Sequence, residues 1–272
     1  MEKKRVLYIS QEISPFLPKS DISKAARKLP QGIQEAGKEI RAFMPRYGCI
    51  NERRHQLHEV IRLSGMNLII NDVDHPLIIK VASVPQAKIQ VYFIDNEDFF
   101  TRKATVKDED GEYFEDNDER AMFFGRGVLE TVKKLGWKPD IIHCHGWMTA
   151  LTPLYIKKLY NNDPHFADAK VVYSVYDNSF NKNWDPKFNE KLKFDGFNEA
   201  DVADLENLDW VTLNKKAIEV SDGVIQGSEN MDASISEYIE KSEIPFLEYY
   251  SEETCVKPVN EFYDQIFEEI VV

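Results

Sequence analysis

The sequence has little that would hold a metal or enter a membrane. Only three cysteines occur, Cys49, Cys144 and Cys255, and they are too far apart for a disulfide framework or a metal-ligand spacing. No apolar run approaches the ~20 residues that a bilayer span needs. The charged N-terminus runs straight into a patterned strand, without a signal-peptide cleavage site. We therefore expect a cytoplasmic protein with no metal site and no membrane partner.

Positive charge is also scarce. The chain has 34 lysines and arginines against 47 aspartates and glutamates, which gives a formal net charge of -13. Such a protein repels phosphate, so a nucleic-acid partner is excluded. The acidic stretch "KDEDGEYFEDNDER" lacks the alternating ligand register of a calcium-binding hand. We expect a solvated loop that leads into a helix.

What is present is a pattern of short apolar runs with helical segments between them. At 272 residues and 43% hydrophobic composition, the chain can bury a large core. Buried parallel strands are predicted at 5–10, 39–45, 140–145, 170–176 and 222–228. Helices are predicted at 22–35, 116–135, 149–159 and 208–220. This alternation predicts an α/β fold with a single doubly wound, Rossmann-like parallel sheet.

Two segments depart from that alternation. Residues 57–94 hold the short strands "LHEVIRLSG", "LIIKVASVP" and "KIQVYFID" with turn signals between them, which predicts an antiparallel insertion. The end of the chain is acidic and carries one amphipathic segment, "NEFYDQIFEEI". We expect a domain at 1–228 and an acidic C-terminal tail at 229–272, whose helix packs back on the domain.

In a doubly wound sheet, ligands bind beyond the carboxyl ends of the strands. The first such end is followed by "LPKSDISKAARKLP", a turn and helix start without glycine. Phosphate binding at a helix start needs free backbone N–H groups and close approach. Ser20 or Asp21 can instead accept those N–H groups as an N-cap, with Lys19 offsetting the charge. We expect the helix to cap itself rather than to bind phosphate.

The second strand end is "HCHGWMTA". His143 and His145 share one face of the strand, because side chains alternate, but two histidines are too few for a zinc site. His145 either faces a ligand cleft or is a buried core histidine whose ring nitrogens are hydrogen-bonded within the protein. Trp147 could stack on a sugar ring, or it could be an ordinary buried tryptophan.

The third strand end is "YSVYDNSFN". Tyr176 and Asp177 stand there as candidate cleft residues. Asp177 could orient a hydroxyl, act as a base, or cap the next helix. No nucleophile constellation or carboxylate pair stands out, so the residues themselves assign no catalytic group.

Taken in order, several segments resemble the bacterial glycogen synthases and plant starch synthases, which transfer glucose from ADP-glucose to an α-1,4-glucan. These segments are "VLYISQEISPF", "MPRYGCIN", "VYFIDNEDFFTR", "YFEDNDERAMFFGRGVLE", "PDIIHCHGWMTAL" and "SDGVIQGS". Arg120 and Phe123 match the family's helix after its Tyr-x-Asp-Asn pattern. The resemblance covers Lys4 to Ser228 and implies the N-terminal, acceptor-side half of a GT-B glycosyltransferase.

The resemblance also has departures. Where the family reads Lys-Thr-Gly-Gly-Leu, this chain has Pro18 to Ile22, and where it reads His-Asp-Trp, this chain has Gly146 between His145 and Trp147. The family's Ile-His-Asn becomes Val175, Tyr176 and Asp177. After Ser228 we find no counterpart of the family's nucleotide-binding half with its Arg and Lys pair. The resemblance therefore implies a degenerate donor site.

These observations lead to two main expectations about function, with a structural or regulatory binding module that makes no glucan contact as a third possibility. The first is a glycogen or starch synthase-like half-domain that is catalytically incomplete alone and binds α-glucan or has a regulatory role, with no cofactor and weak or absent ADP-glucose binding. The alternative is an active synthase, alone or with a partner chain that supplies a nucleotide-binding domain. In either case Lys19, Ser20, Asp21, His145, Trp147, Tyr176 and Asp177 are the candidate ligand-cleft residues.

Overall fold

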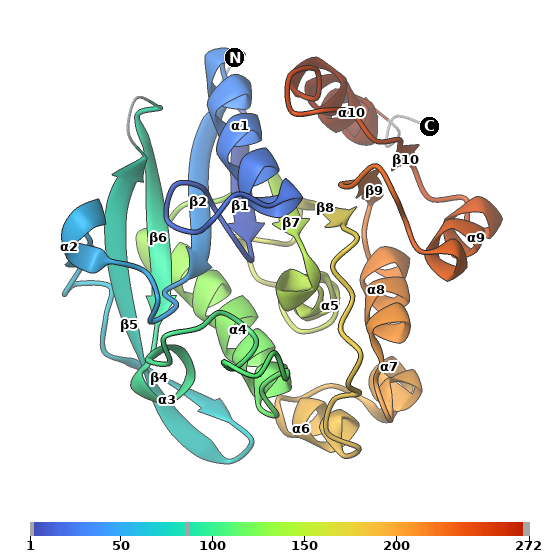
Figure 1. Ribbon diagram of the computed structural model, residues 1–272. Helices are drawn as coiled ribbons and strands as arrows, with labels where there is room; N and C mark the ends of the chain where they lie inside the picture. The colour runs from blue at the N-terminus through green and yellow to red at the C-terminus, as the bar shows by residue number, and fades with distance from the viewer. Residues whose placement is uncertain (1–2, 85–86, 269–272) are drawn as a thin grey trace.

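The computed structural model describes residues 3–84 and 87–268, and its centre is one large sheet (Figure 1). The strands lie in the order β10-β9-β8-β7-β1-β2-β6-β5-β3, with β4 paired to β5. Strands β10 to β6 of this order run parallel, and β3 and β5 are antiparallel to their neighbours. The parallel strands are β1 Arg5–Ser10, β2 Glu39–Pro45, β6 Ile89–Asp95, β7 Ile141–His145, β8 Lys170–Val175, β9 Gly223–Gln226 and β10 Phe246–Leu247.

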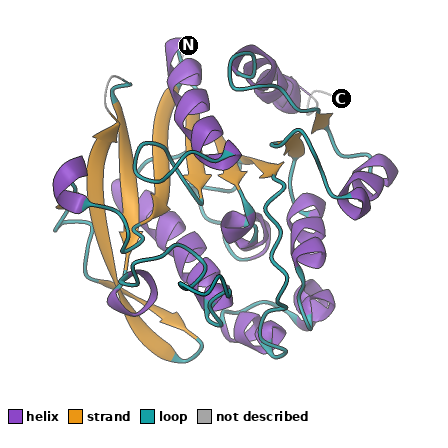
Figure 2. Ribbon diagram, viewed as in Figure 1, coloured by secondary structure: helices purple, strands orange, loops and turns teal. Residues whose placement is uncertain are grey.

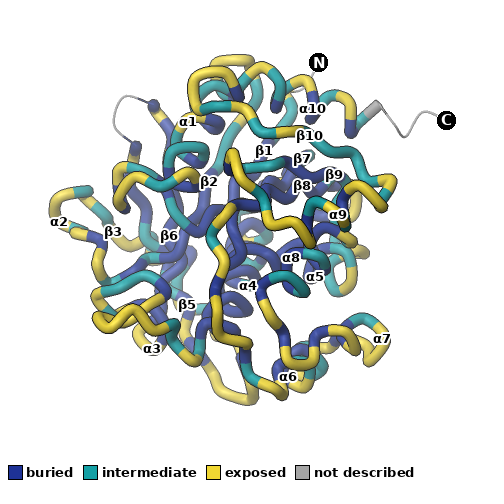
Figure 3. The backbone as a smooth tube through the Cα atoms, turned by 45° about the vertical axis from the view of Figure 1, so that its right-hand side comes forward, coloured by how far each residue is buried: buried dark blue, intermediate teal, exposed yellow. Residues whose placement is uncertain are grey.

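The sheet is covered on both faces, as a doubly wound fold requires. On β6, Phe93 packs edge-on against Phe16, which precedes α1 (Asp21–Glu35), whereas the next residue, Ile94, lies under Gly127 of α4 (Asn117–Leu135). Figure 1 shows α1 and α10 together at the top of the view, with α4 and α5 lower down. The central strands β1, β7 and β8 are therefore buried along almost their whole length (Figure 3).

Four of the helices lie where the sequence predicts them (Figure 2). Predicted helices 22–35, 116–135, 149–159 and 208–220 correspond to α1, α4, α5 and α8, and α5 is preceded by a 3-10 turn, Trp147–Thr149. The helices are α1 Asp21–Glu35, α2 Glu52–His55, α3 Glu97–Phe100, α4 Asn117–Leu135, α5 Leu151–Lys158, α6 Phe188–Phe194, α7 Glu199–Val202, α8 Trp210–Glu219, α9 Ala233–Lys241 and α10 Val256–Glu268. A second 3-10 turn, Ala203–Leu205, follows α7.

The antiparallel segment differs from the prediction in three strands: β3 covers only two residues of the predicted strand 57–65, β4 lies between the predicted strands, and β6 is shared with the parallel sheet. β3 His58–Glu59, β4 Met66–Ile70 and β5 Val73–Val84 form the insertion. "KIQVYFID" was expected to belong to it, but β6 pairs parallel with β2 on one side and antiparallel with β5 on the other. β6 thus joins the insertion to the parallel sheet, and its interior is buried on both faces.

The C-terminal residues contribute to the core. α10 packs against α1 at Gly32, where an added Cβ would lie 2.5 Å from Val256, and its Tyr263 is fully buried. The predicted tail helix was 260–270. The structure begins it at Val256 and follows it to Glu268, and residues 269 and 270 lie outside the described residues. The domain boundary at Ser228 stays a prediction.

No helix within the described residues combines the length and the apolar character needed to cross a bilayer. The cytoplasmic location stays a prediction.

Candidate functional site

The strand order reverses between β1 and β7, because the chain passes from β1 to β2 on one side and later returns to β7 on the other. Such a reversal is where doubly wound sheets bind ligands, beyond the carboxyl ends of the strands. The residues that leave these two strands lie together, since the N–H of Gln11 donates to the carbonyl of His145 at 3.1 Å.

At the β1 end, the start of α1 is capped by its own chain. Ser20 is the N-cap: its hydroxyl oxygen accepts the N–H of Ser23 at 3.0 Å, and the Ser23 hydroxyl oxygen accepts the N–H of Ser20 at 2.8 Å. Asp21 begins the helix with its carboxylate exposed, 3.4 Å from the ammonium group of Lys24. Lys19 is exposed. Ser20 therefore accepts one of the N–H groups that a phosphate at this helix start would use.

A carboxyl group that the sequence analysis missed reinforces this cap. Glu12 is half-buried, and the hydroxyl of Ser20 donates to its Oε2 at 2.5 Å. Burial raises the pKa of Glu12, and the hydrogen bond from Ser20 opposes that rise. The start of α1 is thus flanked by Glu12 and Asp21, two acidic groups that disfavour an anion there.

The β7 end is also closed by a side chain. The amide oxygen of Gln11 accepts the N–H of Met148 at 3.2 Å, in the 3-10 turn that follows the strand. Gly146 before it has φ 83 and ψ 161, a region open in practice only to glycine. A Cβ at Gly146 would lie 2.9 Å from Ile22 and 3.0 Å from the Gln11 oxygen. This turn is packed against the β1 loop with no room for a side chain.

His143 and His145 share one face of β7, but both are fully buried. Nδ1 of His145 lies 2.7 Å from the hydroxyl of Tyr176, and Nε2 has no hydrogen-bond partner among the described residues. His143 contacts the hydroxyls of Tyr263 and Ser174 at 2.6 and 2.7 Å. Burial lowers the pKa of His145 to about 3. His145 is therefore a neutral core side chain that packs against Tyr8 and Tyr176.

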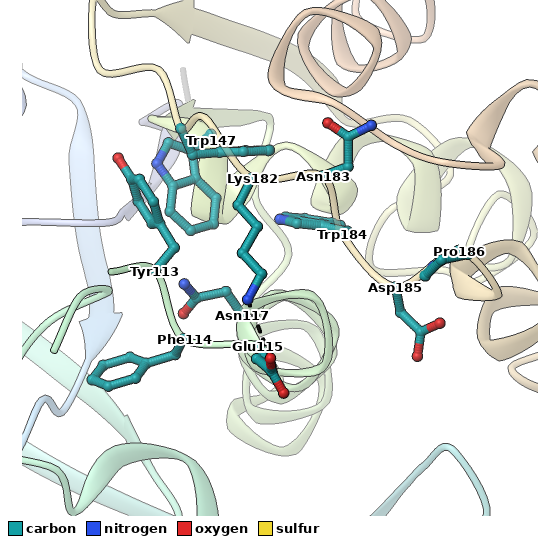
Figure 4. A pocket seen from close by; sticks show the side chains of 11 residues that line it. Tyr113, Phe114, Glu115, Asn117, Trp147, Lys182, Asn183, Trp184, Asp185 and Pro186 are labelled. Atoms are coloured by element: carbon teal, nitrogen blue, oxygen red, sulfur yellow. Dashed lines mark hydrogen bonds and ion pairs between the residues drawn. The ribbon is translucent and has the colours of Figure 1, made fainter. Parts of the chain in front are cut away.

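Trp147 lies on the other side of the turn and lines an aromatic cavity of about 340 Å³ (Figure 4). Its ring meets Phe180 edge-on at 5.1 Å, and Phe180 stacks on Trp184 at 5.7 Å with an interplanar angle of 10°. Tyr113 closes the aromatic wall at 6.4 Å from Trp147. We call this the aromatic cavity; it is lined by Tyr113, Phe114, Glu115, Asn117, Trp147, Phe180, Lys182, Asn183, Trp184, Asp185 and Pro186.

Polar groups ring the aromatic cavity. Glu115 and Lys182 form an ion pair at 3.2 Å, and Asn183 is exposed beside them. A set of flat apolar rings with amide and carboxylate groups around them suits a neutral ligand with both apolar faces and hydroxyl groups. Sugar rings have this chemistry.

The walls of the aromatic cavity are held by buried charges. Arg120 is fully buried and donates to the carbonyls of Phe99 and Thr105 at 2.9 and 2.7 Å. These bonds fix the loop that leads to Tyr113. On the opposite side, the ammonium of Lys191 lies 2.7 Å from Asp118 of α4 and 3.1 Å from Asp185. Burial raises the pKa of Asp118, although the hydrogen bond from Lys191 opposes the rise.

The remaining predicted residues lie elsewhere. Tyr176 is buried and lines a second, smaller cavity of about 60 Å³ together with Asp21. Asp177 is exposed, and its N–H donates to Ser228. Asp177 does not cap the next helix, because α6 begins only after its N-cap Lys187.

The structure thus separates the residues predicted for one cleft. Of that set it places only Trp147 in the aromatic cavity. Sequence reasoning missed its partners Tyr113, Phe180 and Trp184. The sequence did contain a hint of two of these partners. Phe180 and Trp184 are two aromatic residues, four positions apart, in the loop that follows the end of β8.

Comparisons with known proteins agree on one family. The protein-family model described as "Starch synthase catalytic domain" matches residues 5–243 of this chain. A glycogen synthase of Chlorobium limicola is 43% identical over 173 residues, which is 63% of this chain and 35% of that protein. A glycogen synthase of Chlorobaculum tepidum is 39% identical over 202 residues, 71% of this chain and 41% of that protein. The chain therefore spans about two fifths or less of these curated relatives.

A solved structure shares the fold. The catalytic domain of starch synthase IV from Arabidopsis thaliana, bound to ADP and acarbose, superposes with a TM-score of 0.70 over 92% of this chain and 52% of that chain. The two are 18% identical, so the likeness concerns the fold.

Proposed function

This chain belongs to the starch synthase catalytic domain family, and from that membership we propose that it binds α-1,4-glucan in the aromatic cavity and does not transfer glucose by itself. The observation that carries the proposal is the set of four aromatic rings, Tyr113, Trp147, Phe180 and Trp184, at the carboxyl edge of the sheet. Tyr113 is half-buried, whereas Trp147, Phe180 and Trp184 are buried and pack on one another. This apolar wall suits the apolar face of a glucose ring, and the polar rim suits sugar hydroxyls. A neutral glucan is also compatible with a net charge of -13.

The second half of the proposal rests on the closed strand ends. Ser20 caps α1, Gln11 caps the turn after β7, and Glu12 and Asp21 add negative charge beside the helix start. Stabilising a leaving diphosphate needs donors aimed at it, and removing even one such donor costs about 3 kcal/mol. We therefore propose that ADP-glucose binds weakly or not at all and that transfer, where it occurs, needs a partner chain that supplies nucleotide contacts.

An active synthase is the second candidate. It is favoured by the curated relatives named glycogen synthase and by the fold shared with a starch synthase that was bound to ADP and acarbose. Incorporation of labelled glucose from ADP-glucose into glycogen separates the two. We expect no incorporation by the purified chain, and clear turnover would favour the second candidate.

Glucan binding is tested by titration calorimetry with maltoheptaose and by co-sedimentation with glycogen. The Tyr113→Ala variant should weaken binding by about three- to ten-fold, because one stacking ring is lost. Tyr250→Ala is the matched control: Tyr250 is 42% exposed and lies outside the aromatic cavity. Equal affinities of Tyr113→Ala and wild type would contradict the proposed site.

A further inference from the structure

The side chain of Lys182 crosses the aromatic cavity. In Figure 4 it extends between Trp147 and Tyr113 on one side and Trp184 on the other, and its ammonium group reaches Glu115. The Nζ to Oε1 distance is 3.2 Å. A sugar ring placed among these aromatic residues would meet the lysine side chain first.

Lys182 and Glu115 belong to different walls of the cavity. Glu115 lies on the loop before α4, next to Tyr113, and Lys182 lies on the loop after β8, between Phe180 and Trp184. The two walls are also joined where the hydroxyl of Tyr113 donates to the carbonyl of Ser179 at 2.9 Å. Buried Lys191 joins them again through Asp118 and Asp185. The Lys182–Glu115 ion pair is a third link between the two walls, across the opening of the aromatic cavity.

This ion pair is more exposed than the Lys191–Asp118 pair, and the Tyr113–Ser179 hydrogen bond is exposed as well. The side chain of Lys182 is 47% exposed and that of Glu115 is 90% exposed, whereas Lys191 and Asp118 are buried. An exposed pair contributes little free energy and is screened by salt. It can therefore open at low cost, while the buried Lys191–Asp118 pair keeps the walls in place.

We propose that Lys182 and Glu115 form an electrostatic latch over the aromatic cavity, which must open before a glucan chain can bind. This inference rests on the glucan-binding function proposed above. When the latch opens, the lysine side chain leaves the cavity, and the carboxylate of Glu115 becomes free to accept hydrogen bonds from sugar hydroxyls.

The latch predicts that glucan affinity depends on salt concentration, which glucan binding without a latch does not predict. A neutral glucan has no charge of its own, so salt has no direct electrostatic effect on its affinity. Screening weakens the Lys182–Glu115 pair and so favours the open form. We expect affinity for maltoheptaose to rise by about two- to five-fold between about 20 mM and about 0.5 M NaCl, the range that an exposed ion pair allows.

Three variants separate the effect of the charges of the ion pair from the effect of the volume of the Lys182 side chain. Lys182→Met removes the charge and keeps an unbranched side chain, Glu115→Gln removes the partner charge, and Lys182→Ala removes both charge and bulk. Each should bind maltoheptaose more tightly than wild type at low salt and lose the salt dependence, with the largest gain for Lys182→Ala. Lys187→Met is the matched control, because Lys187 lies on the same loop and forms no ion pair within the described part of the chain.

A second measurement needs no ligand. Opening of the latch exposes Trp147 and Trp184, so quenching of tryptophan fluorescence by neutral acrylamide should increase with salt in wild type and be high at all salt concentrations in Lys182→Ala. Maltoheptaose binding that is independent of salt and unchanged in Lys182→Ala overturns the latch and leaves glucan binding intact. Absence of maltoheptaose binding in every variant at both salt concentrations overturns both proposals.

Discussion

Placing a side chain at Gly146 tests whether the turn after β7 is closed. The family pattern resembled by this chain has aspartate at that position, so Gly146→Asp restores the missing carboxylate. In the structure, Gly146 has φ 83 and ψ 161. A new Cβ would lie 2.9 Å from Ile22 and 3.0 Å from the amide oxygen of Gln11. Both the backbone and the neighbouring side chains oppose the substitution.

The expected cost has two parts. Holding a residue other than glycine in this backbone region costs about 1–3 kcal/mol. Displacing Gln11 breaks its hydrogen bond to the N–H of Met148, which adds about 1 kcal/mol. Gly146→Asp and Gly146→Ala should each lower the free energy of unfolding by about 2–4 kcal/mol, a large share of a typical total of about 5–15 kcal/mol.

Urea unfolding followed by circular dichroism measures this loss. Gly136→Ala is the control, since Gly136 also has a positive φ of 60 but open space around it. It should cost about 1–2 kcal/mol from the backbone alone. If Gly146→Asp costs no more than Gly136→Ala, the turn accommodates a side chain and the argument for a closed strand end fails.

Three further predictions concern the stability of the fold. Lys191→Met should lower the free energy of unfolding by about 3–5 kcal/mol, because Asp118 is left buried without its partner. Burial raises the pKa of Asp118 in the folded state, so urea unfolding should show a smaller loss at low pH, where the carboxyl is protonated. His145, with a folded pKa of about 3 against an ordinary 6.5, should lower stability by about 2 kcal/mol as the pH falls from 7 to 5, because only the unfolded chain takes up the proton. His145→Asn should lose only this share of the pH dependence in the same assay, because burial also lowers the pKa of His143, which keeps its own share. Gly48→Ala should lower the free energy of unfolding by about 3 kcal/mol, because the new Cβ would lie 2.1 Å from the carbonyl oxygen of Thr101, and a thermal melt that matches wild type would contradict this.

The central sheet could be predicted from the sequence because its strands are buried on both faces. Runs such as "RVLYIS" and "KVVYSV" are apolar or uncharged along nearly their whole length, which distinguishes them from half-exposed strands. The pairing of β6 was harder, because a strand between a parallel and an antiparallel neighbour has the same local pattern as either. β10 was missed because a strand of two residues has no periodicity to detect.

The candidate site could be predicted only as a set of strand ends. Side-chain alternation placed His143 and His145 on one face of β7, but it could not say what covers that face. The answer is Tyr263 on α10, more than a hundred positions along the chain, whose hydroxyl lies 2.6 Å from His143. Likewise, Trp147 meets Tyr113 only because α4 and its preceding loop return to the carboxyl edge of the sheet.

The closed strand ends and the aromatic cavity depend on the same turn. Trp147 directly follows Gly146 and begins the 3-10 turn whose Met148 N–H is held by Gln11. The backbone of Gly146 therefore allows close packing against the β1 loop and, one residue later, directs a tryptophan into the opposite cavity. A carboxylate at position 146 would disturb both features. In this chain, the close packing of the strand ends and the orientation of Trp147 therefore both depend on Gly146. On the proposed function, that link predicts that a protein with this turn holds a neutral sugar chain better than a diphosphate.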